Sequence, residues 1–343
     1  MHKMILDTDP GIDDAMAIAY ALAHPQIELI GLTTVFGNTN IDFTTRNAQH
    51  ILDTFGASTV ALAKGAARPI VQDPLPHAEF VHGADGIGNI YPGSRPGVPA
   101  EALASLNPEA RHASLEDKDA ADFIINAAKH NPREITLVAV GPLTNIAEAL
   151  RREPGLPSLV AGLVIMGGTV SEPGNVSPVA EANFMNDPHA ADAVLAVDWP
   201  ATVVGLDVTH RIMIADSDLQ QLHQNAGITG SFIWDSSRFY VNFYSSTGAA
   251  RKAVESGQEP QCAMHDAAAI ACVLIPDAFS TIEGASRVVP DGLAAGQLIV
   301  KSNDQSYRVP HWENRAGVHI CMKVDANRVL QHFLQTIMDY HLT

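Results

Sequence analysis

The chain has few basic residues, and this limits the partners it can bind. Its 343 residues include 21 lysines and arginines against 38 aspartates and glutamates, which gives a formal net charge of −17 at pH 7. The lysines and arginines form no cluster, so the chain offers no positive patch for a polyanion. The composition therefore argues against nucleic acid, anionic membranes and phosphorylated substrates. It favours a neutral small molecule or a cation.

Cysteines and long apolar runs are scarce as well. The chain has 3 cysteines, and Cys262 and Cys272 have apolar neighbours in the sequence. An odd number in such surroundings predicts reduced thiols in a cytoplasmic protein. No apolar run is long enough to span a bilayer, and no signal peptide precedes the first strand. We therefore expect a soluble, unexported protein that folds without disulfide bonds.

Buried strands and helical patterns alternate along the chain. The spacing of apolar residues predicts strands at 4–6, 27–36, 60–63, 135–140, 163–166, 201–206, 297–301 and 318–324. Helices are predicted from residue 13, at 41–55, 117–130, 143–151, from 187, at 216–224, 231–244, from 265, and at 325–341. This order predicts an α/β fold with a doubly wound, mostly parallel sheet flanked by helices, as a single domain over residues 1–343. Residues 64–115 have no periodicity, so they are either disordered or functional.

The first predicted strand leads directly into an acidic turn. Met4-Ile5-Leu6 is followed by Asp7 and Asp9, by a Pro10-Gly11 turn, and by Asp13 and Asp14 at a helix start. Four carboxylates so close together repel one another, and burying them is costly unless a cation lies among them. Oxygen ligands in an irregular set favour Ca²⁺ over octahedral Mg²⁺. Helix capping is the alternative, but it explains only one or two of the four acids.

The acidic turn also carries a resemblance to a known family. Asp7-Thr8-Asp9-Pro10-Gly11-Ile12-Asp13-Asp14-Ala15 resembles the N-terminal signature of the nucleoside hydrolases, the inosine-uridine-preferring, calcium-dependent N-ribohydrolases. The resemblance continues over most of the chain, at residues 33–38, 45–48, 82–88, 141–145, 174–183 and 263–267. It implies an enzyme that hydrolyses the N-glycosidic bond of ribonucleosides, with its active site at the carboxyl edge of the sheet, where open α/β sheets bind ligands.

The resemblance implies roles for the metal ligands and the catalytic residues. Ca²⁺ would be held by Asp9, Asp14, the backbone carbonyl of Val140, and Asp266. Asp9 would take a proton from a water on the cation, and His265 would protonate the departing base. By themselves, Asp266 is more simply a helix cap and His265 an exposed turn residue. The acidic turn and the family pattern together favour the functional roles.

The resemblance also implies contacts to the substrate. Ribose would be bound by Asp13, Asn38, Met166, Asn175, Glu181, Asn183 and Asp266. The base would lie near His82, Tyr240 and His265. Ala182 departs from the aromatic residue that many family members have there, so the base preference stays open. Members of the family form dimers and tetramers, and we expect a homodimer or homotetramer.

Two other functions fit part of the pattern. Asp7-x-Asp9 after a strand resembles the nucleophile motif of haloacid-dehalogenase-type phosphohydrolases, although the acidity of the chain and the missing phosphate-binding basic residue oppose that interpretation. A non-catalytic, calcium-dependent sugar-binding module would use the same acids, but it would leave His265 without a role.

Overall fold

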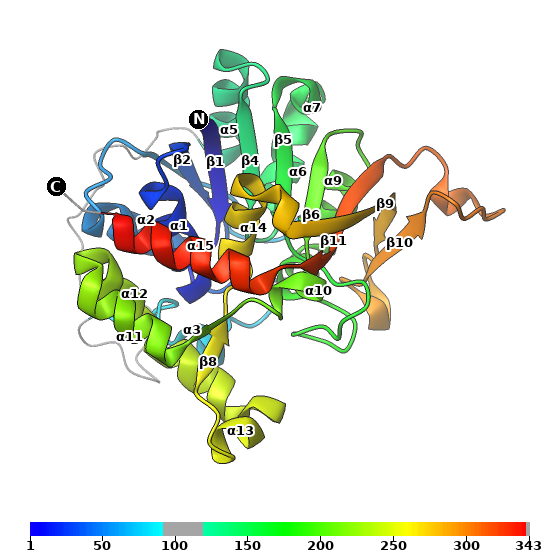
Figure 1. Ribbon diagram of the computed structural model, residues 1–343. Helices are drawn as coiled ribbons and strands as arrows, with labels where there is room; N and C mark the ends of the chain where they lie inside the picture. Colours follow the sequence, from blue (N-terminus) through cyan, green and yellow to red (C-terminus); the bar gives the residue numbers. More distant parts are fainter. Residues whose placement is uncertain (92–118, 341–343) are drawn as a thin grey trace.

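One large sheet organises the protein. The computed structural model describes residues 1–91 and 119–340 (Figure 1). Within these ranges a nine-stranded sheet has the order β10-β9-β11-β6-β5-β4-β1-β2-β3. Its strands, in that order, are Leu298–Ser302, Phe279–Val288, Gly317–Val324, Ala201–Val204, Gly162–Met166, Ile135–Ala139, His2–Thr8, Ile27–Thr34 and Ala61–Lys64.

The sheet is parallel except at one end. Every neighbouring pair from β11 to β3 is parallel, whereas β9 runs antiparallel to both β11 and β10. The predicted mostly parallel α/β fold is therefore confirmed. Strand β9 was not predicted, and neither was the small antiparallel pair of β7 (Met213–Ala215) and β8 (Gln261–Ala263). The strand predicted at 201–206 ends at Val204, because Leu206 begins a short helix.

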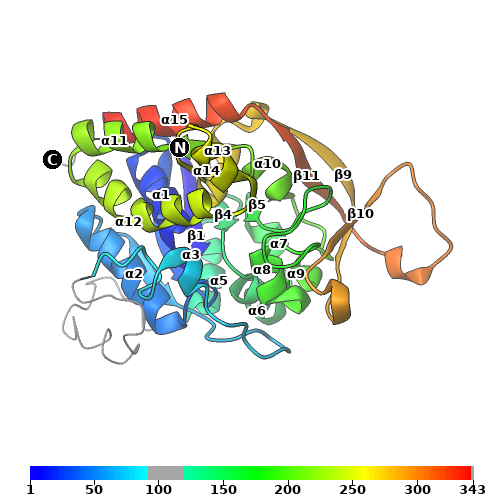
Figure 2. The ribbon, with the colours of Figure 1, turned by 90° about the horizontal axis from the view of Figure 1, so that it is seen from below.

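Helices cover both faces of the sheet (Figures 1 and 2). The hydrophobic core of one face joins the sheet to the helices α1 (Ile12–Ala23), α2 (Ile41–Thr54), α11 (Asp216–Asn225), α12 (Gly227–Ser246), α14 (His265–Leu274) and α15 (Ala326–Asp339). The core of the other face joins it to α5 (Ala120–His130), α6 (Thr144–Arg152) and α9 (Pro188–Val194). The shorter helices are α3 (Glu79–His82), α7 (Leu156–Leu159), α8 (Ala182–Asn186), α10 (Leu206–Thr209) and α13 (Gly248–Glu255).

Strand β1 shows how the sequence divides the two cores. Met4 and Leu6 belong to the core beside α1, and Ile5 belongs to the core beside α5, because successive side chains of a strand point to opposite faces. The strand is buried from Met4 to Thr8. Its carboxyl end therefore delivers the acidic turn into the interior of the molecule.

Several predictions concern residues beyond the described ranges. The predicted loop 64–115 extends past residue 91, and the helix predicted from residue 117 is seen from Ala120. The described cysteines Cys262, Cys272 and Cys321 are free and buried, as expected. Among the helices of the described residues, none has the length and apolar character that a membrane span requires.

Candidate active site

A pocket opens at the carboxyl edge of the sheet, where the predicted site residues converge. It is lined by Asp13, Asn38, Ala78, Phe80, Val81, His82, Val140, Met166, Asn175, Val176, Glu181, Ala182, Asn183, Tyr240, Phe243, Tyr244, His265 and Asp266. Asn38, Val140 and Met166 lie just beyond or at the carboxyl ends of β2, β4 and β5. The predicted site residues that line this pocket therefore lie at the carboxyl edge of the sheet.

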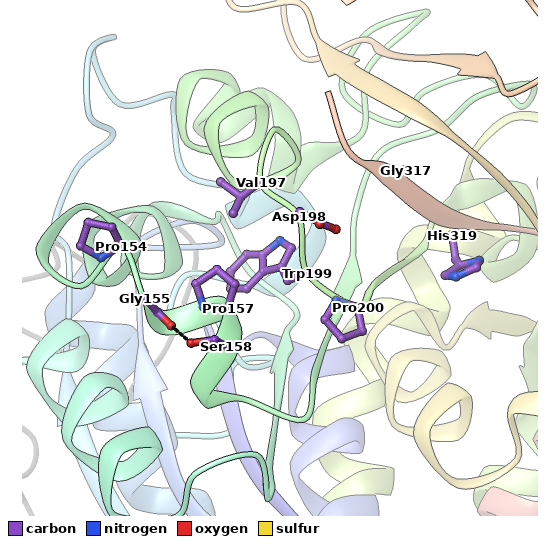
Figure 3. Close-up of a pocket in the computed structure, with 10 residues that line it drawn as sticks. All are labelled: Pro154, Gly155, Pro157, Ser158, Val197, Asp198, Trp199, Pro200, Gly317 and His319. Atoms are coloured by element: carbon purple, nitrogen blue, oxygen red, sulfur yellow. Dashed lines mark hydrogen bonds between the residues drawn. The ribbon is translucent and has the colours of Figure 1, made fainter. Parts of the chain in front are cut away.

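A second hollow lies at the opposite edge (Figure 3). It is lined by residues at the amino ends of β5, β6 and β11, namely Pro154, Gly155, Pro157, Ser158, Val197, Asp198, Trp199, Pro200, Gly317 and His319. In Figure 3, Asp198 and His319 lie apart, and Ser158 is occupied by a hydrogen bond to the Gly155 carbonyl. This hollow has no converging set of polar groups that would suit chemistry.

Three carboxylates meet at the inner end of the first pocket. One oxygen from each of Asp13, Asp14 and Asp266 lies within 4.8 Å of the other two, and all three residues are buried. Asp13 and Asp14 are in the first turn of α1, and Asp266 is in the first turn of α14. Two helix N-termini therefore point at the cluster, and their partial positive charge offsets part of its negative charge.

The protein alone does not compensate this cluster. Burial, followed by the neighbouring Asp14 carboxylate, raises the pKa of Asp13 to about 8. Burial and the nearby carboxylates raise the pKa of Asp266 well above its ordinary value, and burial raises the pKa of Asp14. Carboxylates with such raised pKa values bind protons at neutral pH unless a cation takes the place of the protons. The cluster can hold a metal ion.

Asp9 lies beside the cluster and has one unpartnered oxygen. Its Oδ2 accepts a hydrogen bond from the Asn38 backbone N–H at 2.7 Å, whereas its Oδ1 is buried and has no hydrogen-bond partner among the described residues. A Cβ atom at Gly37 or Gly141 would collide with this carboxylate, so two glycines make room for it. Burial and then the charge of Asp14 raise its pKa well above the ordinary range. An unpaired buried carboxylate oxygen is what an oxygen-ligated cation would satisfy.

The remaining oxygens of the site are held in fixed positions. Asp14 accepts hydrogen bonds from the Thr8 hydroxyl at 2.5 Å, from the Gly11 backbone N–H at 2.9 Å and from Asn38 Nδ2 at 3.1 Å. The Val140 carbonyl accepts one from Asn183 Nδ2 at 2.8 Å, which leaves it a second lone pair. These oxygens fit a hard cation.

Asp7 does not belong to the cluster, although its position in the sequence suggested that it did. Its Oδ1 accepts hydrogen bonds from Thr33 Oγ1 at 2.5 Å and from Asn145 Nδ2 at 2.7 Å. Burial raises its pKa to about 7. Asp7 therefore joins β1 to β2 and α6. It is one of the four acids of the turn, but it was not among the predicted cation ligands.

The loop between β5 and α8 contributes the polar groups expected for ribose. Glu181 caps α8 and accepts hydrogen bonds from the backbone N–H groups of Gly168, Asn183 and Phe184 at 2.9 to 3.2 Å. Burial raises its pKa to about 7. Asn175 Oδ1 accepts from the Ala182 backbone N–H at 3.0 Å, so its amide nitrogen is available to a ligand.

Aromatic side chains and two histidines also line the pocket. His82 Nδ1 accepts a hydrogen bond from the Ile12 backbone N–H at 3.2 Å, and the His82 ring stacks on Tyr240 with centroids 5.6 Å apart. Tyr240 donates a long hydrogen bond of 3.4 Å to Asp13. Phe80, which is 69% exposed, packs edge-on against Phe243. The structure thus brings the predicted base contacts together.

His265 is buried and hydrogen-bonded at both ring nitrogens. Its Nε2 lies 2.8 Å from the Tyr244 hydroxyl, and its Nδ1 lies 2.7 Å from the Thr209 hydroxyl. Burial, then the neighbouring His210 and His82, lowers its pKa to about 3. The ring has almost no contact with water, unlike the exposed turn residue that the local sequence by itself suggests. Tyr244 and Thr209 were not predicted as site residues.

Comparison with known proteins identifies the family to which this site belongs. A family model described as inosine-uridine preferring nucleoside hydrolase matches residues 4–331. A probable uridine nucleosidase 2 of Arabidopsis thaliana is 34% identical over 339 residues, which is 98% of each chain. A plant nucleoside hydrolase of known structure superposes with a TM-score of 0.85 at 32% identity, covering 98% of this chain and 99% of that one. The chain belongs to the nucleoside hydrolase family.

A further solved structure agrees with this assignment. A purine-preferring ribonucleoside hydrolase from Gardnerella vaginalis superposes with a TM-score of 0.82 at 31% identity, covering 98% of both chains. As a nucleoside hydrolase, the protein is an N-glycosidase that cleaves the N-glycosidic bond of ribonucleosides. The phosphohydrolase and the non-catalytic sugar-binding module are thereby excluded.

Proposed function

We propose that this nucleoside hydrolase uses Ca²⁺ at the acidic cluster to bind ribose, with Asp9 as the base that activates water and His265 as the acid that protonates the departing base. One observation carries the proposal: a single pocket is lined by buried carboxylates and amides together with His265 and aromatic rings. Cleavage of an N-glycosidic bond needs a water nucleophile, stabilisation of a cationic ribose and a proton for the leaving group.

The cation would be held by oxygen atoms alone. Asp9, Asp14, Asp266 and the Val140 carbonyl supply them, and an irregular set of oxygens suits Ca²⁺ better than Mg²⁺. The unpartnered Oδ1 of Asp9 supports this set. When bound, Ca²⁺ would orient the ribose hydroxyls and make a bound water more acidic.

The protein's own residues would carry the proton and hold the sugar. Asp9 would take the proton from the attacking water. The ribose hydroxyls would be held by Asp13, Asn38, Met166, Asn175, Glu181, Asn183 and Asp266. Carboxylates around the ring would also stabilise the positive charge that develops on ribose as the bond breaks.

His265 would act on the other side of the bond. Burial holds its pKa at about 3, so the ring is neutral at pH 7 before substrate binds. Negative charge that develops on a departing base beside the ring would raise this pKa, because an opposite charge favours the protonated imidazole. The ring would then take up a proton from water in the pocket and pass it to the base. The position of His265 in the pocket, beside the aromatic rings, supports this role.

The proposal covers ribonucleosides as a class. The relatives differ in name, since one is a uridine nucleosidase and another is purine-preferring. The rings of Tyr240, Phe243 and Tyr244 line the pocket and would contact the base, since an aromatic face stacks on a purine or a pyrimidine alike. We further propose one domain over residues 1–343 and a homodimer or homotetramer in the cytoplasm, which stay predictions.

Removal of the metal tests the proposal. Exhaustive chelation should abolish ribose release from a panel of nucleosides, and added Ca²⁺ should restore it, whereas Mg²⁺ should restore little. The apoenzyme should keep its circular dichroism spectrum, which controls for unfolding. Full turnover by enzyme shown to be metal-free by elemental analysis would refute the metal requirement.

A further inference from the structure

The ring of His265 depends on a residue outside the pocket. Thr209 ends α10, fifty-six positions before His265 in the sequence, and its side chain is fully buried. It is absent from the described residues that line the pocket, so it does not reach a bound substrate. Its hydroxyl nevertheless lies 2.7 Å from His265 Nδ1. Any effect of Thr209 on the reaction must pass through His265.

The two partners of His265 lie on different sides of the ring. Tyr244, at Nε2, lines the pocket, so a substrate can displace or share that hydrogen bond. Thr209, at Nδ1, is buried behind the ring and stays in place when the pocket fills. A fixed partner at one ring nitrogen sets the orientation of the whole ring. The contact between Thr209 and Nδ1 therefore directs Nε2 into the pocket.

A hydroxyl is well suited to this position. It can donate to a bare Nδ1 or accept from an Nδ1–H, so it holds the ring whether His265 is neutral or protonated. A carboxylate, the common partner of a catalytic histidine, would add another negative charge near Asp13, Asp14 and Asp266. The hydroxyl fixes the ring without that cost.

We infer that Thr209 is a positioning residue for the reaction: through its hydrogen bond to Nδ1, it holds the His265 ring with Nε2 directed at the leaving base. The inference rests on the proposed role of His265 as the acid. It concerns orientation of the ring and not its affinity for protons. It assigns a function to a buried residue of α10 that touches neither substrate nor cation.

Isosteric replacement tests the inference. Thr209→Val keeps the shape of the side chain and removes the hydroxyl, and Thr209→Ser keeps the hydroxyl. Thr209→Val should lower kcat on the best nucleoside by about 10- to 100-fold, the cost of misplacing a catalytic group. Its KM should change little. Cleavage of p-nitrophenyl riboside, whose leaving group departs as a stable anion, should stay near wild type. Thr209→Ser should keep most of the nucleoside turnover.

The controls separate positioning from folding. Thr336→Val makes the same change at a buried threonine of α15 whose hydroxyl bonds only its own helix at the His332 carbonyl, and it should leave both substrates unaffected. If Thr209→Val does not fold, Thr209→Cys, which offers a much weaker hydrogen bond, should show an intermediate loss confined to the nucleoside. Thermal unfolding and calcium content, measured for each variant, report whether α14 and Asp266 have moved.

Three outcomes would overturn the inference. The first is unchanged nucleoside turnover in Thr209→Val, the second is an equal loss on both substrates, and the third is a Thr209→Ser variant as impaired as the valine. His265→Ala, measured in parallel, distinguishes failure of the acid role of His265 from failure of the positioning role of Thr209. If His265→Ala loses activity on both substrates, the acid assignment itself fails. If it spares p-nitrophenyl riboside while Thr209→Val has no effect, only the inference about Thr209 fails.

Discussion

His265 is the residue for which structure and sequence suggest the most different properties. The sequence places it at a helix start, and the structure buries it in the pocket between Thr209 and Tyr244. If it donates a proton to the base, its removal matters only where the leaving group needs one. His265→Ala should therefore lose about 10²- to 10⁴-fold in nucleoside turnover.

The same variant should cleave p-nitrophenyl riboside at nearly the wild-type rate, because nitrophenolate leaves without a proton. Steady-state rates on both substrates check this. Equal losses would show that His265 acts through ribose binding or through the fold, and the acid role would then move to another residue, with His82 as the first candidate.

Asp9 should behave in the opposite way, because water activation is common to all substrates. Asp9→Asn keeps the acceptor for the Asn38 N–H but removes the base and a charged ligand, so both substrates should lose about 10²-fold or more. Asp7→Asn is the matched control, since Asp7 is an equally buried acid two positions earlier that bonds Thr33 and Asn145 instead. It should keep most of its turnover. A nucleoside-specific loss in Asp9→Asn would contradict the assignment.

At the scale of elements, the sequence predicts strands, turns and site residues best where the residues that indicate them are close together in the chain. The parallel strands β1 to β6 are followed within a few residues by glycine or proline, and each was found within a few residues of its predicted position. The acidic turn was recognised because its carboxylates are adjacent in the chain. Proximity in the chain does not place Asp7 with the other acids, since alternation along β1 sends its side chain toward α6.

The partners of His265 could not be predicted in this way. Thr209 and Tyr244 lie 56 and 21 positions from it, and nothing in their local sequence distinguishes them from core residues. Strand β9 was missed because Ser280, Thr281 and Glu283 are exposed and interrupt its apolar pattern. The loop at 82–91 has no periodicity, yet the buried carboxylate of Asp85 orders it by accepting hydrogen bonds from three backbone N–H groups. Contacts between distant parts of the chain decide the case of His265, whereas Asp85 orders its own loop through local hydrogen bonds.

One carboxylate connects the antiparallel end of the sheet to helix α9, in addition to the pairing of β9 with β11. Asp192 of α9 pairs with Arg287 of β9 and with Arg315, which precedes β11. Burial alone would raise the pKa of Asp192, but the hydrogen bonds from Arg287, the Val288 N–H and Arg315 outweigh it and hold the pKa below the ordinary value. Asp192→Asn should cost about 2 kcal/mol of unfolding free energy at pH 7, since it leaves two guanidinium groups without their charge partner.

The sign of the pH dependence follows from the lowered pKa. The stabilisation from Asp192 is fully present above the unfolded pKa, about 3.9, and is lost as pH falls through the lower folded value. Urea unfolding of wild type and Asp192→Asn should therefore differ by a constant amount from pH 5 to 7 and converge below about pH 4. Asp291→Ala, which removes an exposed carboxylate, is the control. A difference that persists unchanged at pH 3 would refute the ionic origin.

At the scale of the whole molecule, the net charge of −17 acts on every substrate that approaches the pocket. A nucleoside is neutral, whereas its 5′-monophosphate has a charge of about −1.5 to −2 at pH 7. The pocket adds a local charge of the same sign through Glu181 and the aspartate cluster, and a bound Ca²⁺ would offset only part of it. The lining of the pocket includes no lysine or arginine among the described residues.

We therefore expect kcat/KM for the 5′-monophosphate of the best nucleoside to be lower than for the nucleoside itself by about 10-fold or more, because repulsion opposes both encounter and binding. The salt dependence of kcat/KM distinguishes electrostatic repulsion from a steric clash with the phosphate. Raising the ionic strength from about 0.01 to 0.15 M shortens the Debye length from about 30 to 8 Å, so the ratio between the two substrates should narrow while the nucleoside alone changes little. Equal efficiencies at low salt would show that the acidic field does not select substrates. A large ratio that does not change with salt would instead assign the discrimination to the shape of the pocket, and the lining residues Asn175 and Glu181 would then be the residues to change.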